Sequence, residues 1–371
     1  MSETDEFAEA LLAQLSVEIN EEKEIDSLSK KIKEDNEFKV EFGDTEKIAQ
    51  TLLPDLIQRV NDYMGLSVSP DLSIVGLELE ELKRFKGKKV FTTKAARQFV
   101  DELFYAVSKN DLEKISDSIK KDTTKFLVYS TYVKSYISKI STTYGDFLDN
   151  TIYLNKFVLD SYPKIILYKQ RPPYEPKSES VKSGYMGALK MTILEEIVHS
   201  VQNNLQRLNK VAVIQVNEIN EELARTILEL DDSTVSQLSE YLQLQSVPEE
   251  FVIAKRANLF FMLNPDNFIT NVLGPDIMTY NKVEIDPKIL EFIPSLLEIY
   301  QRWLKPIQAQ HAVFTTMEGM AEFVVQNILK DDPDFQNYLS TFIGIDYSAY
   351  SVKKSIGKEF TEKIFETFGK D

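Results

Sequence analysis

One helical stretch carries two glutamates and a histidine close together among apolar side chains, and it constrains the fold more than any other segment. Over residues 186–208, Leu, Ile and Val recur at the three- and four-residue spacing of an amphipathic helix. Glu195, Glu196 and His199 lie within this stretch. Because residues three and four apart share a helix face, these side chains point into roughly one sector. Converging carboxylates must be protonated, bound to a metal or paired with a cation, so the fold has to supply their partners.

A second acidic helix is predicted far downstream. Glu318 and Glu322 are four residues apart in the run Met317-Glu-Gly-Met-Ala-Glu-Phe323, so they also share one face. Gly319 directly follows Glu318. Since glycine has no Cβ atom, it lets this helix approach another backbone closely.

These motifs resemble those of zincin-like metallopeptidases of the gluzincin type. The run Met191-Thr-Ile-Leu-Glu-Glu-Ile-Val-His-Ser-Val-Gln202 is similar to their metal-binding helix, T-I-L-H-E-L-V-H-A-V-Q. The segment 318–323 is similar to their E-G-x-A-E-[FY] helix. Asn150-Thr-Ile-Tyr-Leu-Asn155 resembles the edge strand beside the active-site helix. Together the motifs cover about residues 145–330 in the order of the family.

The resemblance implies a role for each residue. Glu195, His199 and Glu318 would hold one divalent metal, which requires them to converge although 119 positions separate the last two. Glu196 would be the catalytic general base. Glu322 would support the ligands by a hydrogen bond. Three tyrosines are candidates for the oxyanion donor of this family, and no local pattern chooses among them: Tyr338, Tyr347 and Tyr350.

One position departs from the family pattern, because Glu195 replaces the first motif histidine. The carboxylate adds a negative charge and a hard oxygen ligand. Zinc prefers nitrogen and sulfur, whereas oxygen-rich sites suit manganese or iron better, and added negative charge makes the metal a weaker acid for its water. The substitution favours a degenerate site that holds no cofactor and acts by binding a peptide or protein. An active metal-dependent peptidase or hydrolase, with Zn, Mn or Fe, is the first alternative.

A non-hydrolytic metal site of the di-iron carboxylate type is the second alternative. Such sites combine glutamates with two Glu-x-x-His motifs. Glu196-x-x-His199 is one such motif, but His311, the other histidine of the chain, has no glutamate three residues before it. The missing second motif makes this alternative the weakest of the three.

Composition excludes several classes of protein. The 371 residues carry a net charge of −16, and nucleic-acid binding rests on neutralising phosphates, so we expect no nucleic-acid partner. The chain has no cysteine, which excludes disulfides and thiolate chemistry. Residues 1–9 are polar and acidic, and no apolar run reaches membrane-spanning length. We therefore expect a soluble, cytoplasmic protein without a membrane partner.

The periodicity predicts a mainly helical α+β protein. We expect an acidic N-terminal arm over 1–40, a mostly helical region over 41–144 and a zincin-like core over 145–371. A helical insertion over about 205–312 would separate the two ligand-bearing helices, since compact gluzincins have a much shorter gap. Alternating apolar and polar residues predict strands at 70–80, 150–155 and 164–169. Residues that favour turns (Asn, Asp and Pro) predict a loop over 265–287.

Overall fold

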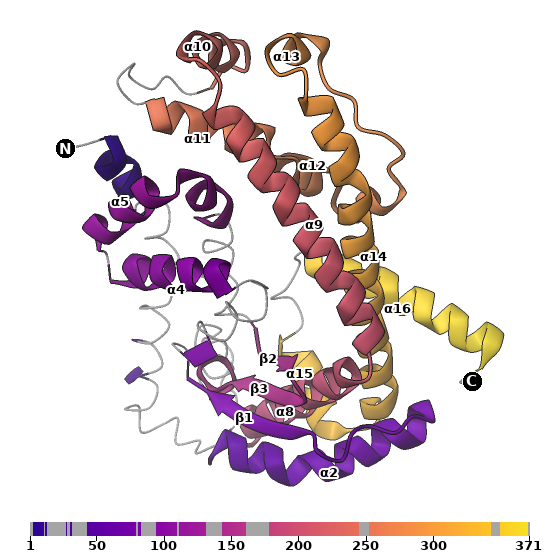
Figure 1. Ribbon diagram of the computed structural model, residues 1–371. Helices are drawn as coiled ribbons and strands as arrows, with labels where there is room; N and C mark the ends of the chain where they lie inside the picture. Colours follow the sequence, from indigo (N-terminus) through magenta and orange to yellow (C-terminus); the bar gives the residue numbers. More distant parts are fainter. Residues whose placement is uncertain are drawn as a thin grey trace. The chain divides into compact units, whose positions relative to one another are not determined.

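The computed structural model shows a mostly helical chain with one small sheet (Figure 1). It describes residues 3–10, 12, 27, 30–31, 43–78, 81–82, 94–109, 111–130, 143–160, 178–244, 252–342 and 349–369. The predicted mainly helical α+β class is confirmed at this level. None of the described helices is long and apolar enough to cross a membrane.

The elements have the following bounds. In chain order they are α2 (Thr45–Met64), β1 (Ser73–Leu77), α4 (Lys94–Ser108), α5 (Leu112–Lys121), β2 (Gly145–Leu148), β3 (Thr151–Asn155), α8 (Ser178–Ser200), α9 (Asn203–Leu228), α10 (Asp232–Tyr241), α11 (Val252–Leu263), α12 (Pro265–Leu273), η2 (Gly274–Thr279), α13 (Pro287–Phe292), α14 (Leu296–Leu329), α15 (Pro333–Phe342) and α16 (Ala349–Phe368).

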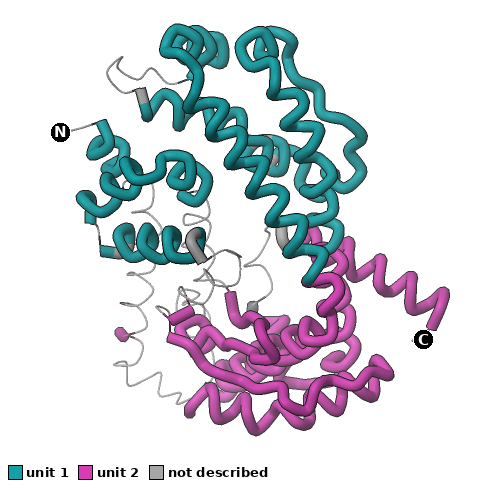
Figure 2. The backbone as a smooth tube through the Cα atoms, in the orientation of Figure 1, with its two compact units in different colours: residues 1–19, 90–137, 207–313 teal, residues 20–89, 138–206, 314–371 magenta. Residues whose placement is uncertain are grey.

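The chain forms two compact units, each built from separate stretches of sequence (Figure 2). Unit 1 comprises Met1–Ile19, Val90–Ile137 and Arg207–Val313. Unit 2 comprises Asn20–Lys89, Ser138–Gln206 and Phe314–Asp371. The stretch expected as a helical insertion is mostly helical where it is described, and all but its first two residues belong to unit 1.

The sheet of unit 2 has the strand order β1-β3-β2, with β1 parallel and β2 antiparallel to β3. Asp149 and Asn150 connect β2 to β3 with positive φ angles of 49° and 61°, as a two-residue hairpin turn requires. The predicted strand at 150–155 is β3, but its place as an edge strand is wrong, because β2 takes the edge and β3 the centre. The strand predicted at 70–80 is β1, and the one at 164–169 lies outside the described residues.

Helices α2, α8 and α15 build the core of unit 2. α2 begins after Asp44, whose carboxylate accepts the N–H groups of Glu46 and Lys47, and it ends at Gly65 in the left-handed conformation. α8 packs against α2, β2 and α15. A Cβ atom on Gly187 of α8 would lie 2.2 Å from the carbonyl oxygen of Asp334, so these two helix backbones touch.

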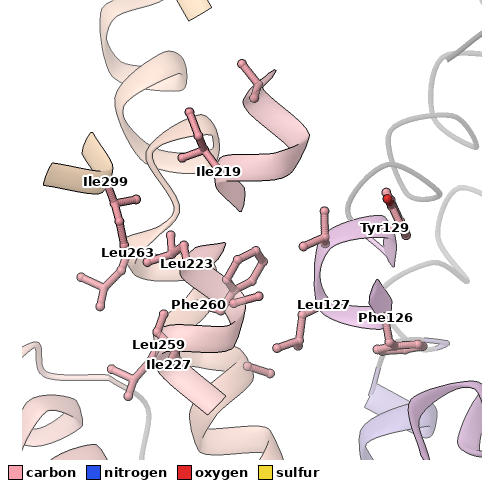
Figure 3. Close-up of a cluster of buried hydrophobic side chains, with 14 of the residues drawn as sticks. Phe126, Leu127, Tyr129, Ile219, Leu223, Ile227, Leu259, Phe260, Leu263 and Ile299 are labelled. Atoms are coloured by element: carbon pink, nitrogen blue, oxygen red, sulfur yellow. The ribbon is translucent and has the colours of Figure 1, made fainter. Parts of the chain in front are cut away.

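Unit 1 is mostly helical in its described residues, and its core contains Phe126, Phe260 and Trp303 (the first two drawn in Figure 3). The loop predicted over 265–287 is wrong in its first half, which forms α12 and η2. Asn264 accepts the N–H of Asp266 as a helix cap, and Pro265 takes the first helical position. Pro265, the first residue of the predicted loop, is therefore part of a helix start.

Candidate functional site

The helix that carries the acidic motif ends sooner than its periodicity predicts. α8 ends at Ser200 and α9 begins at Asn203, where one helix over 186–208 was expected. The backbone N–H of Gln202 donates to the carbonyl of His199, a three-residue bond that tightens the last turn. This break places the side chain of Gln202 beside that of His199.

Gln202 fixes the orientation of the His199 ring. Its Nε2 donates to the carbonyl of Met317 at 3.1 Å, so its Oε1 faces Nδ1 of His199 at 2.8 Å. An amide oxygen accepts only, and therefore Nδ1–H is the donor. The other ring nitrogen, Nε2, faces Oε1 of Glu318 at 3.6 Å. The structure thus brings His199 and Glu318 together across the 119 positions between them.

The carboxylates meet at an ammonium group from α16. Nζ of Lys354 donates to Oε1 of Glu195 at 2.5 Å. The same nitrogen lies 3.9 Å from Oε2 of Glu322 and 4.0 Å from Oε2 of Glu318. These four side chains are 13–24% exposed, so water screens them only in part. We refer to these four residues as the Lys354 cluster.

Two glycines let α16 come close enough to deliver this lysine. A Cβ atom on Gly319 of α14 would lie 2.0 Å from the carbonyl carbon of Gly357. A Cβ atom on Gly357 would lie 1.9 Å from the carbonyl oxygen of Thr315. The close approach predicted at Gly319 is therefore confirmed, and its partner is α16. The crossing point is one residue from Glu318 and three residues from Lys354, which explains why they meet.

Glu196, the expected general base, lies on the other side of the motif, beside the sheet. Its side chain is buried, and a Cβ atom on Gly145 of β2 would lie 3.3 Å from its Oε1. It is close enough to His199 to raise the pKa of the imidazole. The side chain of Glu196 therefore faces the edge strand β2, whereas that of its sequence neighbour Glu195 faces Lys354.

Among the residues that the structure describes, this site brings four glutamates close to one lysine and one histidine. Burial opposes a charge on His199, but Glu318, Glu196 and Glu195 outweigh it, and the pKa of the imidazole is raised. Burial also raises the pKa of Glu195; Lys354 lowers it, and the neighbouring glutamates add to the rise. The site therefore favours protonated or cationic groups.

A tyrosine pair borders the cluster. The rings of Tyr144 and Tyr338 pack edge to face with centroids 6.5 Å apart. Burial raises the pKa of Tyr338 to about 12; a hydrogen bond from Tyr144 opposes the rise, and Glu195 adds to it. Tyr338 thus keeps its hydroxyl proton near the carboxylates. Of the other candidate tyrosines, Tyr347 and the side chain of Tyr350 lie outside the described residues.

The arrangement does not fit a divalent metal as it stands. The ammonium of Lys354 occupies the point on which Glu195 and Glu318 converge, so a metal ion would compete with it for the same oxygens. Among the described residues, no three or more His, Asp or Glu side chains are arranged to hold a metal ion. The site is instead a largely buried cluster of carboxylates, which Lys354 neutralises in part.

Sequence reasoning missed Lys354 and Gln202. The one available signal for Lys354 was the need of converging carboxylates for a cation, and it does not say which lysine supplies it. His311, which the sequence left unassigned, is a buried residue of unit 1. No family model matches this chain, and no curated protein or solved structure matches it either. The resemblance to zincin-like metallopeptidases therefore stays a hypothesis.

Proposed function

We propose that this protein is a degenerate metallopeptidase-like protein that binds a peptide or protein segment without a metal. The observation that carries the proposal is the position of Lys354. Its ammonium lies among Glu195, Glu318 and Glu322. Zincin-like metallopeptidases would hold their metal at the corresponding place. A lysine can neutralise the carboxylates, but it cannot act as a Lewis acid for water or a carbonyl.

The edge strand β2 supports the binding of an extended segment. The backbone N–H of Asn155 donates to the carbonyl of Tyr144 at 2.8 Å, which makes these two residues a hydrogen-bonded pair. Because such pairs alternate along antiparallel strands, the N–H and carbonyl of Gly145 point away from β3. An extended peptide can add to this edge by main-chain hydrogen bonds, and it would then run past Glu196.

A pocket at the hairpin end of β2 supports the same reading. It has a volume of about 680 Å³ and lies wholly within unit 2. Apolar and polar side chains line it together, as is usual where a side chain of a ligand is held and oriented. Its lining includes Leu66, Phe147, Leu148, Asn150, Val201 and Gln206.

A metal-dependent hydrolase with Glu196 as general base is the second candidate. The observation that favours it is the meeting of His199 and Glu318 at 3.6 Å, with Glu195 on the same cluster. This function requires Lys354 to leave the carboxylates. The two candidates therefore differ in one measurable property, the affinity of the natural protein for a divalent metal.

The first experiment measures metal and peptide binding on the full chain. We expect metal content well below stoichiometry after purification without chelator, and weak zinc binding by isothermal titration. Peptides selected from a displayed library should bind equally well with and without EDTA and remain uncleaved. N-methylation at alternate peptide positions should abolish binding, since strand addition uses every second amide. Near-stoichiometric metal with peptide cleavage would replace this proposal by the hydrolase.

Variants of the cluster test the reason for weak metal binding. Glu195→His combined with Lys354→Met restores a neutral nitrogen ligand and removes the competing cation, so zinc should bind at least about tenfold more tightly. Glu195→His alone should raise zinc affinity less. Lys353→Met is the matched control, since Lys353 lies over the ring of Phe314. Equal, tight zinc binding by the natural protein and the double variant would contradict the proposal.

A further inference from the structure

Helix α16 has two sides of different character. One side packs within unit 2, where Gly357 contacts α14, Thr361 is buried and the ring of Phe365 lies 5.0 Å from that of Phe323. Outside this contact the helix presents five large apolar side chains, each four residues after the last and 38–72% exposed. They are Val352, Ile356, Phe360, Ile364 and Phe368, and we call them the α16 stripe.

The α16 stripe is unusual because exposed apolar residues on soluble proteins are normally scattered. Side chains four apart follow one another along a helix surface and turn by about 40° at each step, so these five form an apolar strip that winds around the helix, with Ile356, Phe360 and Ile364 at its centre. Its length from Val352 to Phe368 is about 24 Å at 1.5 Å per residue. Contiguous exposed apolar surface of this kind marks an interaction site.

The charged residues beside the α16 stripe restrict which partner can cover it. Glu359 and Lys363 are both exposed, and each lies three residues after a member of the stripe, Ile356 and Phe360 respectively. The two therefore border the stripe along the same side, with opposite charges four residues apart. A partner helix must present the complementary order of charges along this border.

We propose that the α16 stripe pairs with the same stripe of a second copy of this chain, in antiparallel orientation about Phe360. In that arrangement Ile356 lies opposite Ile364 of the second copy. Glu359 then faces Lys363 of the second copy, and the two-fold axis repeats the pair. Self-complementarity of this kind is what a two-fold symmetric interface requires.

The parallel orientation is excluded by the inner side of the helix. Parallel helices would bring the border of Glu359 and Lys363 against the opposite border of the second copy. That border contains Gly357, which lies against α14. The antiparallel pair uses the exposed side alone and leaves Lys354 in its cluster, so dimer formation and the carboxylate site are independent.

The experiment is sedimentation of the full chain over a wide range of protein concentration. A single helix pair lies at the small end of specific interfaces, so we expect self-association that is reversible and weak. Phe360→Ser removes the central contact and should weaken the association by about tenfold or more. Phe360 is half exposed, and circular dichroism with the fluorescence of Trp303 will verify that the variant folds. A monomer at every concentration would overturn the proposal.

Charge exchange distinguishes a second copy from any other partner. Glu359→Lys and Lys363→Glu should each weaken self-association, because like charges then meet across the two-fold axis. The double variant should restore it, and an equimolar mixture of the two single variants should form heterodimers. Glu362→Lys makes the same charge change away from the border and should have no effect. Association that both single variants leave unchanged, or that the double variant fails to restore, would overturn the antiparallel pairing.

Discussion

Unit 2 contains two clusters in which one lysine meets several carboxylates. The pKa of a carboxyl group is lowered in the first cluster and raised in the second. In the first, which we call the Lys190 cluster, Nζ of Lys190 on α8 lies 2.7 Å from Asp332 and 2.8 Å from Asp334. In the second, the Lys354 cluster, one lysine meets three glutamates. Both form where a glycine lets two helices touch, and both join residues far apart in the sequence.

The clusters differ in how well the negative charge is satisfied. Burial works to raise the pKa of Asp332, but Lys190 and the backbone N–H groups of Phe335 and Asp334 outweigh it, and the pKa is lowered. The pKa of Glu195 is raised in spite of Lys354. The Lys190 cluster thus stabilises the fold as ionised. In the Lys354 cluster burial and neighbouring glutamates disfavour the ionised form of Glu195, and a carboxyl group perturbed in this way is typical of sites kept for binding or chemistry.

The largest expected effect is from the crossing glycines. Gly187→Ala and Gly319→Ala should each destabilise the protein by about 2–3 kcal/mol, because the new methyl group meets backbone atoms that cannot move aside. Alanine otherwise favours a helix over glycine, so the sign alone is informative. Urea unfolding measures both, with Ser355→Ala on the exposed side of α16 as control. A stabilised Gly319→Ala variant would show that α14 and α16 do not touch.

Replacing each lysine should destabilise the protein with a different pH dependence. Lys190→Met should cost about 2 kcal/mol between pH 5 and 8, because Asp332, whose pKa is lowered, stays ionised there and loses its cation. Lys354→Met should cost as much at pH 8 and much less at pH 5. Glu195, whose pKa is raised, can then take up a proton. Urea unfolding at the two pH values measures this, and equal pH dependence would make the clusters equivalent.

A third prediction concerns His199, whose raised pKa derives mainly from Glu318 once burial is overcome. Glu318→Gln should lower the pKa of His199 in an NMR titration of histidine-labelled protein. The chain has only two histidines, so His199→Gln assigns the signals. Glu322→Gln is the matched control and should shift the pKa less. If the pKa of His199 is unchanged in Glu318→Gln, the carboxylate of Glu318 does not lie close to the imidazole, and the prediction is wrong.

The smallest effect expected is from neutralising one acid in each cluster. A folded-state pKa above the unfolded value means that Glu195 contributes stability at low pH and loses it as pH rises through the folded value. Glu195→Gln should therefore stabilise the protein at pH 8 by about 0.5–1 kcal/mol. The pKa of Asp332 is lowered, so its contribution is present at neutral pH and is lost as pH falls. Asp332→Asn should destabilise at pH 8, and urea unfolding decides both signs.

The sequence predicted what depends on neighbours along the chain. Helical spacing around Glu195 and Glu318 placed both on helices, and Gly319 indicated a close contact before its partner was known. Local patterns also misled, since α12 begins at Pro265, where a loop was predicted over 265–287. The end of α8 at Ser200 was missed because the apolar spacing continues past it, while the bonds of Gln202 that stop the helix are with His199 and the distant Met317.

What the sequence determined by itself is that several carboxylates share a helix sector and need a partner. Only the tertiary structure decided that the partner is Lys354, which lies 159 positions from Glu195. The physical reason is the range of the interactions. Helical periodicity is set by bonds between residues three and four apart, and any sequence reveals it. The pairing of α16 with α14 depends on the backbones that meet at Gly319 and Gly357, and no local pattern records which helices will touch.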